Sequence, residues 1–186
     1  FFRNSERFDD LKDNIFPELL KTRRILRIWS AGASAGQEAY SVAIILREMT
    51  GVTRHYIIGT DVNRAILEVA KAGIYTKEDI KEVKPLILSK YFVKQAGNYI
   101  LSNSIKQMVQ FKLHNLLSDP YETDFDLIIC RNVMIYFTDE AKSNVFRKFH
   151  ESLRPGGILF IGGTETLMSA PIYGFKLTAP FLYEKV

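Results

Sequence analysis

A short turn of small residues, followed later in the chain by an isolated aspartate, could bind a nucleotide-like molecule. The turn, Ala31-Gly32-Ala33-Ser34-Ala35-Gly36, follows an apolar run and precedes a helical pattern. Glycine lets a ligand approach the backbone closely, and the amides at the start of a helix can face that ligand. Asp61 ends a second apolar run, where a carboxylate can accept both hydroxyls of a ribose. Tight strand-to-helix packing and a helix cap would explain the same residues, so both interpretations stay open.

Glu38, just inside the first predicted helix, indicates which cofactor would suit this turn. A carboxylate there would repel a pyrophosphate, which disfavours NAD and ATP, and would suit the sulfonium and ammonium groups of S-adenosylmethionine. Glu38 would serve equally well as a partner for the positive end of the helix dipole. The chain also has no Gly-x-Gly-x-x-Gly run, which argues against a nicotinamide-dependent oxidoreductase.

A second group of polar residues follows another apolar run, in Cys130-Arg131-Asn132-Val133-Met134-Ile135-Tyr136-Phe137. Arg131 either faces a crevice or forms a buried ion pair that holds the end of the sheet. Tyr136 either reaches that crevice or belongs to the core, with its hydroxyl at the surface. Cys130 has no His or Asp at a nucleophile spacing, and we expect it to serve packing. No metal-ligand spacing is formed by the histidines, which are His55, His114 and His150.

Strand-like apolar runs alternate along the chain with helical patterns. The predicted strands are 25–30, 56–61, 109–113, 125–130, 158–161 and 181–186. The predicted helices are 38–49, 63–72 and 138–153. Asn63 and Thr138 are placed to cap the second and third helices, and Gly73 is placed to end the second. Arg154-Pro155-Gly156-Gly157 is expected to end the third helix before the strand at 158–161.

This alternation predicts an α/β fold, with a mostly parallel sheet and helices on both of its faces. The connection before the last strand lacks a helical period, so that strand is expected to run antiparallel. Ligands of such sheets bind beyond the carboxyl ends of the strands, which directs attention to 29–38, 60–62, 114–116 and 130–136. Residues 81–106 interrupt the alternation, and 91–101 reads as a small hairpin.

Composition narrows the class of protein. The chain has 186 residues, of which 47% are hydrophobic, and is expected to form one domain. Its net charge of +4 is too mild to indicate nucleic-acid binding. Neither a secretory signal nor an apolar run long enough for a membrane span is apparent. A single cysteine excludes an internal disulfide framework, so we expect a reducing, cytoplasmic location. We also expect the protein to be a monomer.

Taken together, these residues resemble the CheR family of chemotaxis receptor methyltransferases over nearly the whole chain. The string from Cys130 to Phe137 is highly specific to that family, whereas the glycine turn is shared by many class I methyltransferases. The other matching segments are Phe1-Phe2-Arg3, Trp29-Ser30-Ala31-Gly32, Glu38 with Tyr40-Ser41, Thr60-Asp61, Asn115-Leu116-Leu117 and Leu153-Arg154-Pro155-Gly156-Gly157.

The resemblance implies a class I, Rossmann-like methyltransferase domain over 1–186, with a small β-subdomain inserted at about 81–106. The chain begins at Phe1 rather than Met; we expect it to be part of a longer protein and to lack the family's N-terminal helical domain. In some members the β-subdomain docks a receptor C-terminal peptide. The connecting loop is short here, so we expect that tight docking mode to be missing.

The activity implied is methyl transfer from S-adenosylmethionine to side-chain carboxylates of receptor glutamates. The products would be glutamate γ-methyl esters and S-adenosylhomocysteine, and the partners would be the cytoplasmic helices of the receptors. Two alternatives stay open. One is a non-catalytic S-adenosylmethionine-binding module in a signalling assembly, and the other is a methyltransferase for another substrate, either a nucleic acid or a small molecule.

The resemblance also assigns roles to individual residues. Those expected to bind the cofactor are Arg3, Gly32, Glu38, Asp61, Asn115, Leu116, Arg131 and Asn132. Among them, Asp61 is expected at the ribose, Glu38 at the amino-acid portion, and Asn115 with Leu116 at the adenine. Catalytic roles fall to Arg3, Arg131 and Tyr136. The glycine turn departs from the family pattern at Ala33, Ala35, Gln37 and Ala39.

Overall fold

The computed structural model describes residues 1–51, 54–163, 167 and 170–186. Its centre is a seven-stranded sheet in the order β6-β2-β1-β7-β8-β10-β9. The strands are β1 (Arg27–Ala31), β2 (Tyr56–Asp61), β6 (Val109–Leu113), β7 (Phe125–Cys130), β8 (Leu153–Ile161), β9 (Phe175–Ala179) and β10 (Leu182–Lys185). The first five strands of that order pair in parallel, whereas β10 pairs antiparallel with both β8 and β9. The predicted mostly parallel sheet with an antiparallel last strand is confirmed.

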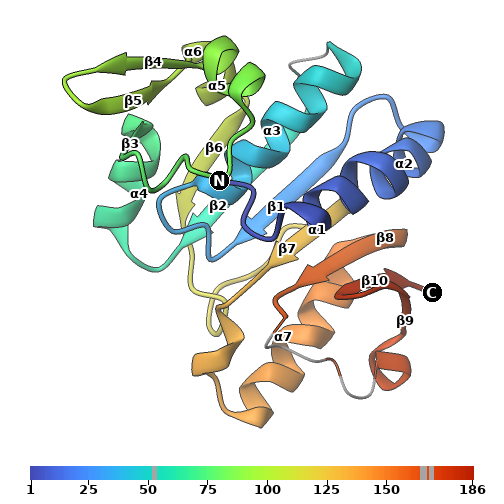
Figure 1. The fold of residues 1–186 in the computed structure, drawn as a ribbon. Helices are drawn as coiled ribbons and strands as arrows, with labels where there is room; N and C mark the ends of the chain where they lie inside the picture. The colour runs from blue at the N-terminus through green and yellow to red at the C-terminus, as the bar shows by residue number, and fades with distance from the viewer. Residues whose placement is uncertain (52–53, 164–166, 168–169) are drawn as a thin grey trace.

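Successive side chains of the buried strands point to opposite faces of this sheet, so each strand contributes to a core on both faces. Ile28 and Ile57 pack into one core with α1 (Ser5–Asp10), the π-helix η1 (Leu11–Ile15), α2 (Phe16–Thr22) and α3 (Gln37–Thr50). Their chain neighbours Trp29 and Ile58 pack into a second core with α7 (Asp139–Ser152). In Figure 1, α3 and the α1–α2 segment lie side by side on the first face.

The predicted caps form as expected. The side chain of Asn63 accepts hydrogen bonds from the amides of Ala65 and Ile66 and begins α4 (Arg64–Ala72). Gly73 ends that helix in the left-handed region, with φ of 64°. The hydroxyl of Thr138 accepts from the amide of Ala141 at the start of α7. These contacts fix the two helices that follow β2 and β7.

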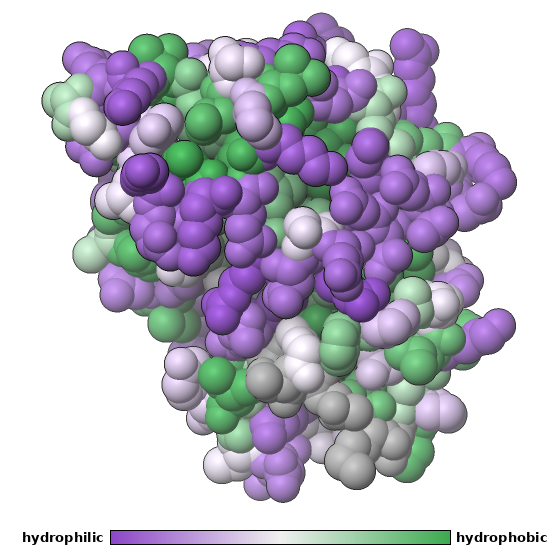
Figure 2. Space-filling view, in the orientation of Figure 1, coloured by the Kyte–Doolittle hydropathy of each residue, from purple (hydrophilic) through white to green (hydrophobic). Residues whose placement is uncertain are grey.

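A second, three-stranded antiparallel sheet lies outside the main one (Figure 1) and contains the predicted hairpin. Its strands are β3 (Ile74–Tyr75), β4 (Phe92–Gln95) and β5 (Asn98–Leu101), and it is accompanied by α5 (Pro85–Tyr91) and α6 (Asn103–Lys106). Figure 2 shows apolar surface near α5 and this sheet, where Leu86 and Val93 are 73% and 64% exposed.

Three features differ from the expectations. The helix ends just before 154–157 as expected, but the strand expected at 158–161 starts earlier, because β8 already begins at Leu153 and includes these residues at a register shift against β7. Gly157 lies in that strand with little space around it, since a Cβ there would be 2.8 Å from the Arg154 carbonyl oxygen. The N-terminal helices and the edge strand β9 were not predicted. No helix among the described residues combines the length and the apolar character needed to cross a bilayer.

Candidate functional site

A cavity of about 990 Å³ opens at the carboxyl ends of β1, β2, β6 and β7. Its volume lies within the range of ligand pockets. The structure brings to its wall every residue to which the sequence assigned a role. They are Arg3, Gly32, Glu38, Asp61, Asn115, Leu116, Arg131, Asn132 and Tyr136. The strand ends gather these residues from distant parts of the chain, as expected for a parallel sheet.

The glycine turn is docked onto the end of β2. The amides of Gly32 and Ala33 both donate to the Thr60 carbonyl oxygen at 2.8 Å. Gly32 has φ of 77°, and a Cβ there would lie 2.2 Å from Cγ2 of Val133. The turn therefore needs glycine both for its backbone conformation and for its close approach to the chain after β7. Gly36 also has positive φ, at 84°, and begins α3.

Asp61 is positioned by two backbone amides. Its Oδ2 accepts from the amide of Ser34 and its Oδ1 accepts from the amide of Asn63, both at 3.0 Å. Each carboxylate oxygen has a second lone pair, and the residue borders the cavity. Because Asn63 caps α4, the helix-cap interpretation of Asp61 is wrong. Its geometry suits a ligand with two adjacent hydroxyls.

Glu38, in the first turn of α3, and Arg131, directly after β7, form an ion pair beside the cavity. The Arg131 Nη1 lies 3.5 Å from Glu38 Oε2, and the two side chains are only 7% and 19% exposed. The Ser30 hydroxyl donates to Glu38 Oε1 at 3.1 Å. Both interpretations of Arg131 therefore hold, since it borders the cavity and also pairs with an acid. Glu38 is oriented by side-chain contacts in addition to its place in the first turn of α3.

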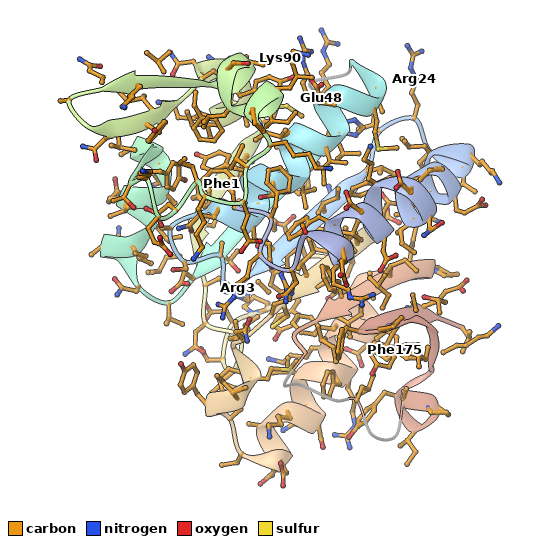
Figure 3. All side chains as sticks on the ribbon, viewed as in Figure 1. Phe1, Arg3, Arg24, Glu48, Lys90 and Phe175 are labelled. Atoms are coloured by element: carbon orange, nitrogen blue, oxygen red, sulfur yellow. The ribbon has the colours of Figure 1, made fainter. Side chains whose placement is uncertain are left out.

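The N-terminal segment, residues 1–4, crosses the start of α3 and ends at the cavity (Figure 3). Phe1 is buried between Tyr75 and Phe92, with ring centroids 4.8 and 5.2 Å away. The Phe2 amide donates to the Ser41 hydroxyl at 3.1 Å. Arg3 is exposed and lines the cavity, so the segment places a cation at the rim.

The loop after β6 forms another wall. Asn115 is exposed, and its side-chain oxygen accepts from the Leu117 amide at 3.0 Å. Leu116 is buried, whereas Leu117 and Val62 are 50% and 66% exposed beside the cavity. A hydrogen bond from the Asn115 amide to Asp119 lowers the pKa of that carboxyl. The result is a wall with apolar side chains and an amide, which suits a flat heteroaromatic ring.

The segment after β7 carries the last two predicted residues. Asn132 has φ of 60°, a conformation that asparagine tolerates better than most residues. Tyr136 belongs to the short 3₁₀ helix η2 (Met134–Tyr136) and is 82% exposed. The core interpretation of Tyr136 is therefore wrong, because its ring stands at the cavity rim. Cys130 is fully buried, as expected for a packing residue.

The sequence reasoning missed an acidic wall before α5, formed by Glu78, Asp79 and Glu82. Asp79 accepts from Thr76 and, at 3.2 Å, from Gln37 Nε2. Burial alone would raise the pKa of Asp79, but these hydrogen bonds outweigh it and the pKa is lowered. The Thr-x-x-Asp spacing is the one local signal that could have indicated this turn. Gln37, a departure from the family pattern, ties the wall to α3. Within the described ranges, no cluster of His, Cys, Asp and Glu is arranged to hold a metal ion.

Comparisons with known proteins agree with this geometry. The family model described as "CheR methyltransferase, SAM binding domain" matches residues 1–179. A chemotaxis protein methyltransferase of Listeria monocytogenes is 43% identical, over all of this chain and 71% of its own length. Chemotaxis protein methyltransferase 1 of Pseudomonas aeruginosa is 38% identical, over 92% of this chain and 66% of its own.

A solved structure shares the fold. The TehB-like SAM-dependent methyltransferase of Corynebacterium glutamicum superposes with a TM-score of 0.51 at 16% identity. The match covers 97% of this chain and 93% of the other. The two proteins therefore share their fold over nearly the whole of both chains.

Proposed function

The chain belongs to the CheR methyltransferase family and uses S-adenosylmethionine as its cofactor, and on that premise we propose that it methylates side-chain carboxylates of specific glutamates in chemotaxis receptors. The products would be glutamate γ-methyl esters and S-adenosylhomocysteine. The names of the relatives, chemotaxis protein methyltransferases, support a substrate in that signalling system. A cytoplasmic location, where the receptor helices carry such glutamates, is part of the proposal.

The observation that carries the proposal is the arrangement of two carboxylates along one cavity. Asp61 presents free lone pairs beside the glycine turn, and Glu38 lies with Arg131 at the start of α3. We assign Asp61 to the ribose, Glu38 to the amino-acid portion, and the wall of Asn115 and Leu116 to the adenine. When bound, S-adenosylmethionine supplies a methyl group on a positively charged sulfur. The negative charge of Glu38 favours that positive end electrostatically.

The acceptor determines what the remaining residues must do. A glutamate side chain has a pKa of about 4.3 and is already an anion at neutral pH. No proton has to be removed, so orientation and exclusion of water remain as the tasks of the site. Fixing two reactants in that way can contribute roughly 7–11 kcal/mol.

Two exposed side chains are available for the orientation of the acceptor. Arg3 at the rim can hold a carboxylate through paired N–H groups, and the Tyr136 hydroxyl can donate a further hydrogen bond. Arg131 has its described hydrogen bonds with Glu38 and residues 1–4. Direct contact of Arg131 with the acceptor stays a prediction.

The proposal is tested by incubating the purified protein with tritiated S-adenosylmethionine and receptor-bearing membranes. We expect label on the receptor that is released by mild alkali, because carboxyl methyl esters hydrolyse and N-methyl groups do not. Alkali-stable label would indicate another methyl acceptor. Cofactor binding without any label on the receptor would support the non-catalytic alternative.

The small sheet is proposed to lack tight docking of a receptor tail peptide. Its hairpin turns through only Ala96 and Gly97 between β4 and β5, which leaves little loop to enclose a peptide. Titration with a peptide of the receptor C-terminus should therefore show no micromolar binding. Binding at that level would show the small sheet to be a docking module.

A further inference from the structure

We propose that Asn4 is a positioning residue: its carboxamide ties residues 1–4 to Arg131 and thereby holds Arg3 at the cavity rim. Asn4 does not itself line the cavity, whereas Arg3 and Arg131 do. The effect on methyl transfer rests on the function proposed above. The effect on the order of the N-terminal segment depends only on the contacts described next.

The backbone around Arg3 is in an unusual conformation. Phe2 and Asn4, on either side of it, have φ of 50° and 62°. Positive φ is unfavourable for a bulky residue such as Phe, and it persists where surrounding contacts impose it. The direction of the chain at Arg3 is therefore set by its neighbours in space.

Arg131 supplies the contacts on the C-terminal side of this segment. Its Nη2 donates to Asn4 Oδ1 at 2.7 Å, and its Nη1 donates to the Arg3 carbonyl oxygen at 3.2 Å. The guanidinium stands over the rings of Phe160 and Phe8, 4.8 and 5.9 Å from their centroids. Arg131 is thus a buried, fixed point to which a more exposed segment is attached.

The side chain of Asn4 is diverted from its usual role. Asn4 stands at the N-cap position of α1, yet its side chain makes no cap hydrogen bond. An asparagine there ordinarily accepts from the helix amides, and here it accepts from Arg131 instead. At 2.7 Å this contact is shorter than the 3.5 Å contact of Arg131 with Glu38. Through Arg131, Asn4 therefore connects Glu38 to the segment that carries Arg3 at the cavity rim.

Three variants of the full protein separate backbone conformation from hydrogen bonding. Asn4→Gly tolerates positive φ but removes the hydrogen-bond acceptor, whereas Asn4→Asp keeps an acceptor for Arg131. Asn4→Ala neither tolerates positive φ well nor offers an acceptor. We expect Asn4→Gly to lower kcat by about tenfold, the effect of one lost hydrogen bond to a charged group, with the KM for the cofactor changed less than twofold. Asn4→Asp should stay within threefold of the wild type, and Asn4→Ala should lose at least as much as Asn4→Gly.

Hydrogen exchange measured by mass spectrometry on the peptide covering residues 1–8 gives a readout independent of activity. Asn4→Gly should exchange faster at Phe2 and Arg3, and Asn4→Asp should match the wild type. Unchanged exchange in Asn4→Gly would overturn the proposal, even if the wild type transferred no methyl group to receptors. Equal losses of kcat and cofactor affinity in all three variants would also overturn it, because they would indicate a general folding role.

Discussion

At the scale of single residues, Arg131 joins Glu38 on the cavity wall to Arg3 and Asn4 of the N-terminal segment. The local sequence predicted that Arg131 would be poorly placed for solvent, and its side chain is 7% exposed. Its contacts with Asn4 and Arg3 join positions 127 and 128 residues apart. No local pattern encodes such pairings, which is why Asn4 escaped sequence analysis while the residues at strand ends did not.

Replacement of Arg131 by alanine should lower methyl transfer far more than cofactor affinity. We expect a loss of about 100-fold in kcat, because a small displacement of a reacting group has an effect of that size. The dissociation constant of S-adenosylhomocysteine, measured by calorimetry, should change by less than about fivefold, since the Ser30 hydroxyl still orients Glu38. Arg131→Lys keeps the charge but lacks the planar guanidinium group. Its kcat should lie between those of the wild type and Arg131→Ala. Equal losses in transfer and affinity would mean that Arg131 is only a cofactor ligand.

At the scale of elements, the bounds of β2, β6 and β7 match the predicted ranges. Strands β2 and β7 are mostly buried and carry nearly continuous apolar runs, whereas the edge strand β6 alternates apolar and polar residues; both patterns are strong signals. The N-terminal helices lack such a signal. The π-helix at Leu11–Ile15 adds a residue to the turn and disturbs the 3.6-residue spacing of the apolar side chains around it. In β9 the apolar and polar residues alternate, but only Phe175 is buried and Leu177 is 57% exposed, so the strand lacks the buried apolar run of the central strands.

The glycine turn offers a prediction about an element, with a matched control. Gly32→Ala places a Cβ 2.2 Å from Val133, whereas Gly97→Ala meets nothing within 4 Å, and the two glycines have φ of 77° and 80°. In both variants the unfavourable backbone conformation should lower the free energy of unfolding by about 1–2 kcal/mol. Gly32→Ala should lose roughly 1–3 kcal/mol more through overpacking. Urea unfolding measures the difference, and equal free energies of unfolding for the two variants would contradict the close packing of the turn.

At the scale of the whole molecule, the N-terminal segment connects parts that the sequence places far apart. Phe1 packs against the small sheet, residues 2–4 cross α3, and Arg131 holds their end at the carboxyl end of β7, the central strand of the main sheet. The α/β class, the parallel sheet and the inserted hairpin followed from patterns within the chain. The contribution of residues 1–3 to the cavity wall depends on the assembled fold, and the order of elements alone could not predict it.

The pH dependence of stability is a property of the whole molecule, because buried His55, just before β2, contacts Leu26 before β1 and Thr50 at the end of α3. Its Nδ1 accepts from the Leu26 amide at 3.2 Å, and its Nε2 lies 3.3 Å from the Thr50 hydroxyl, so the ring is held neutral. Burial lowers the pKa of His55, and the charge of Asp126 offsets this only in part. The unfolded chain therefore takes up the proton first, and stability present above about pH 6.5 is lost as the pH falls.

We expect the free energy of unfolding to fall between pH 6.5 and 5.5 through His55, by at most about 1 kcal/mol, the limit for one group that titrates only in the unfolded chain. Burial also lowers the pKa of His150, with the charge of Lys185 acting in the same direction, so this residue adds a loss of the same sign. Urea unfolding at pH 5.5, 6.5 and 7.5 measures the change. His55→Asn keeps an acceptor for Leu26 but does not titrate, and its stability should depend less on pH. An equal slope in the variant would show that His55 is not the group responsible.

The central claim is that the cavity at the carboxyl edge binds the positive end of the cofactor beside Glu38. Calorimetric titration of S-adenosylmethionine into Glu38→Gln and Glu82→Gln tests it most directly, because both variants remove one negative charge from the wall of the same cavity. We predict that Glu38→Gln weakens binding at least tenfold, as expected for loss of a charged contact, while Glu82→Gln stays within twofold of the wild type. Equal affinities in the two variants and the wild type would contradict the account.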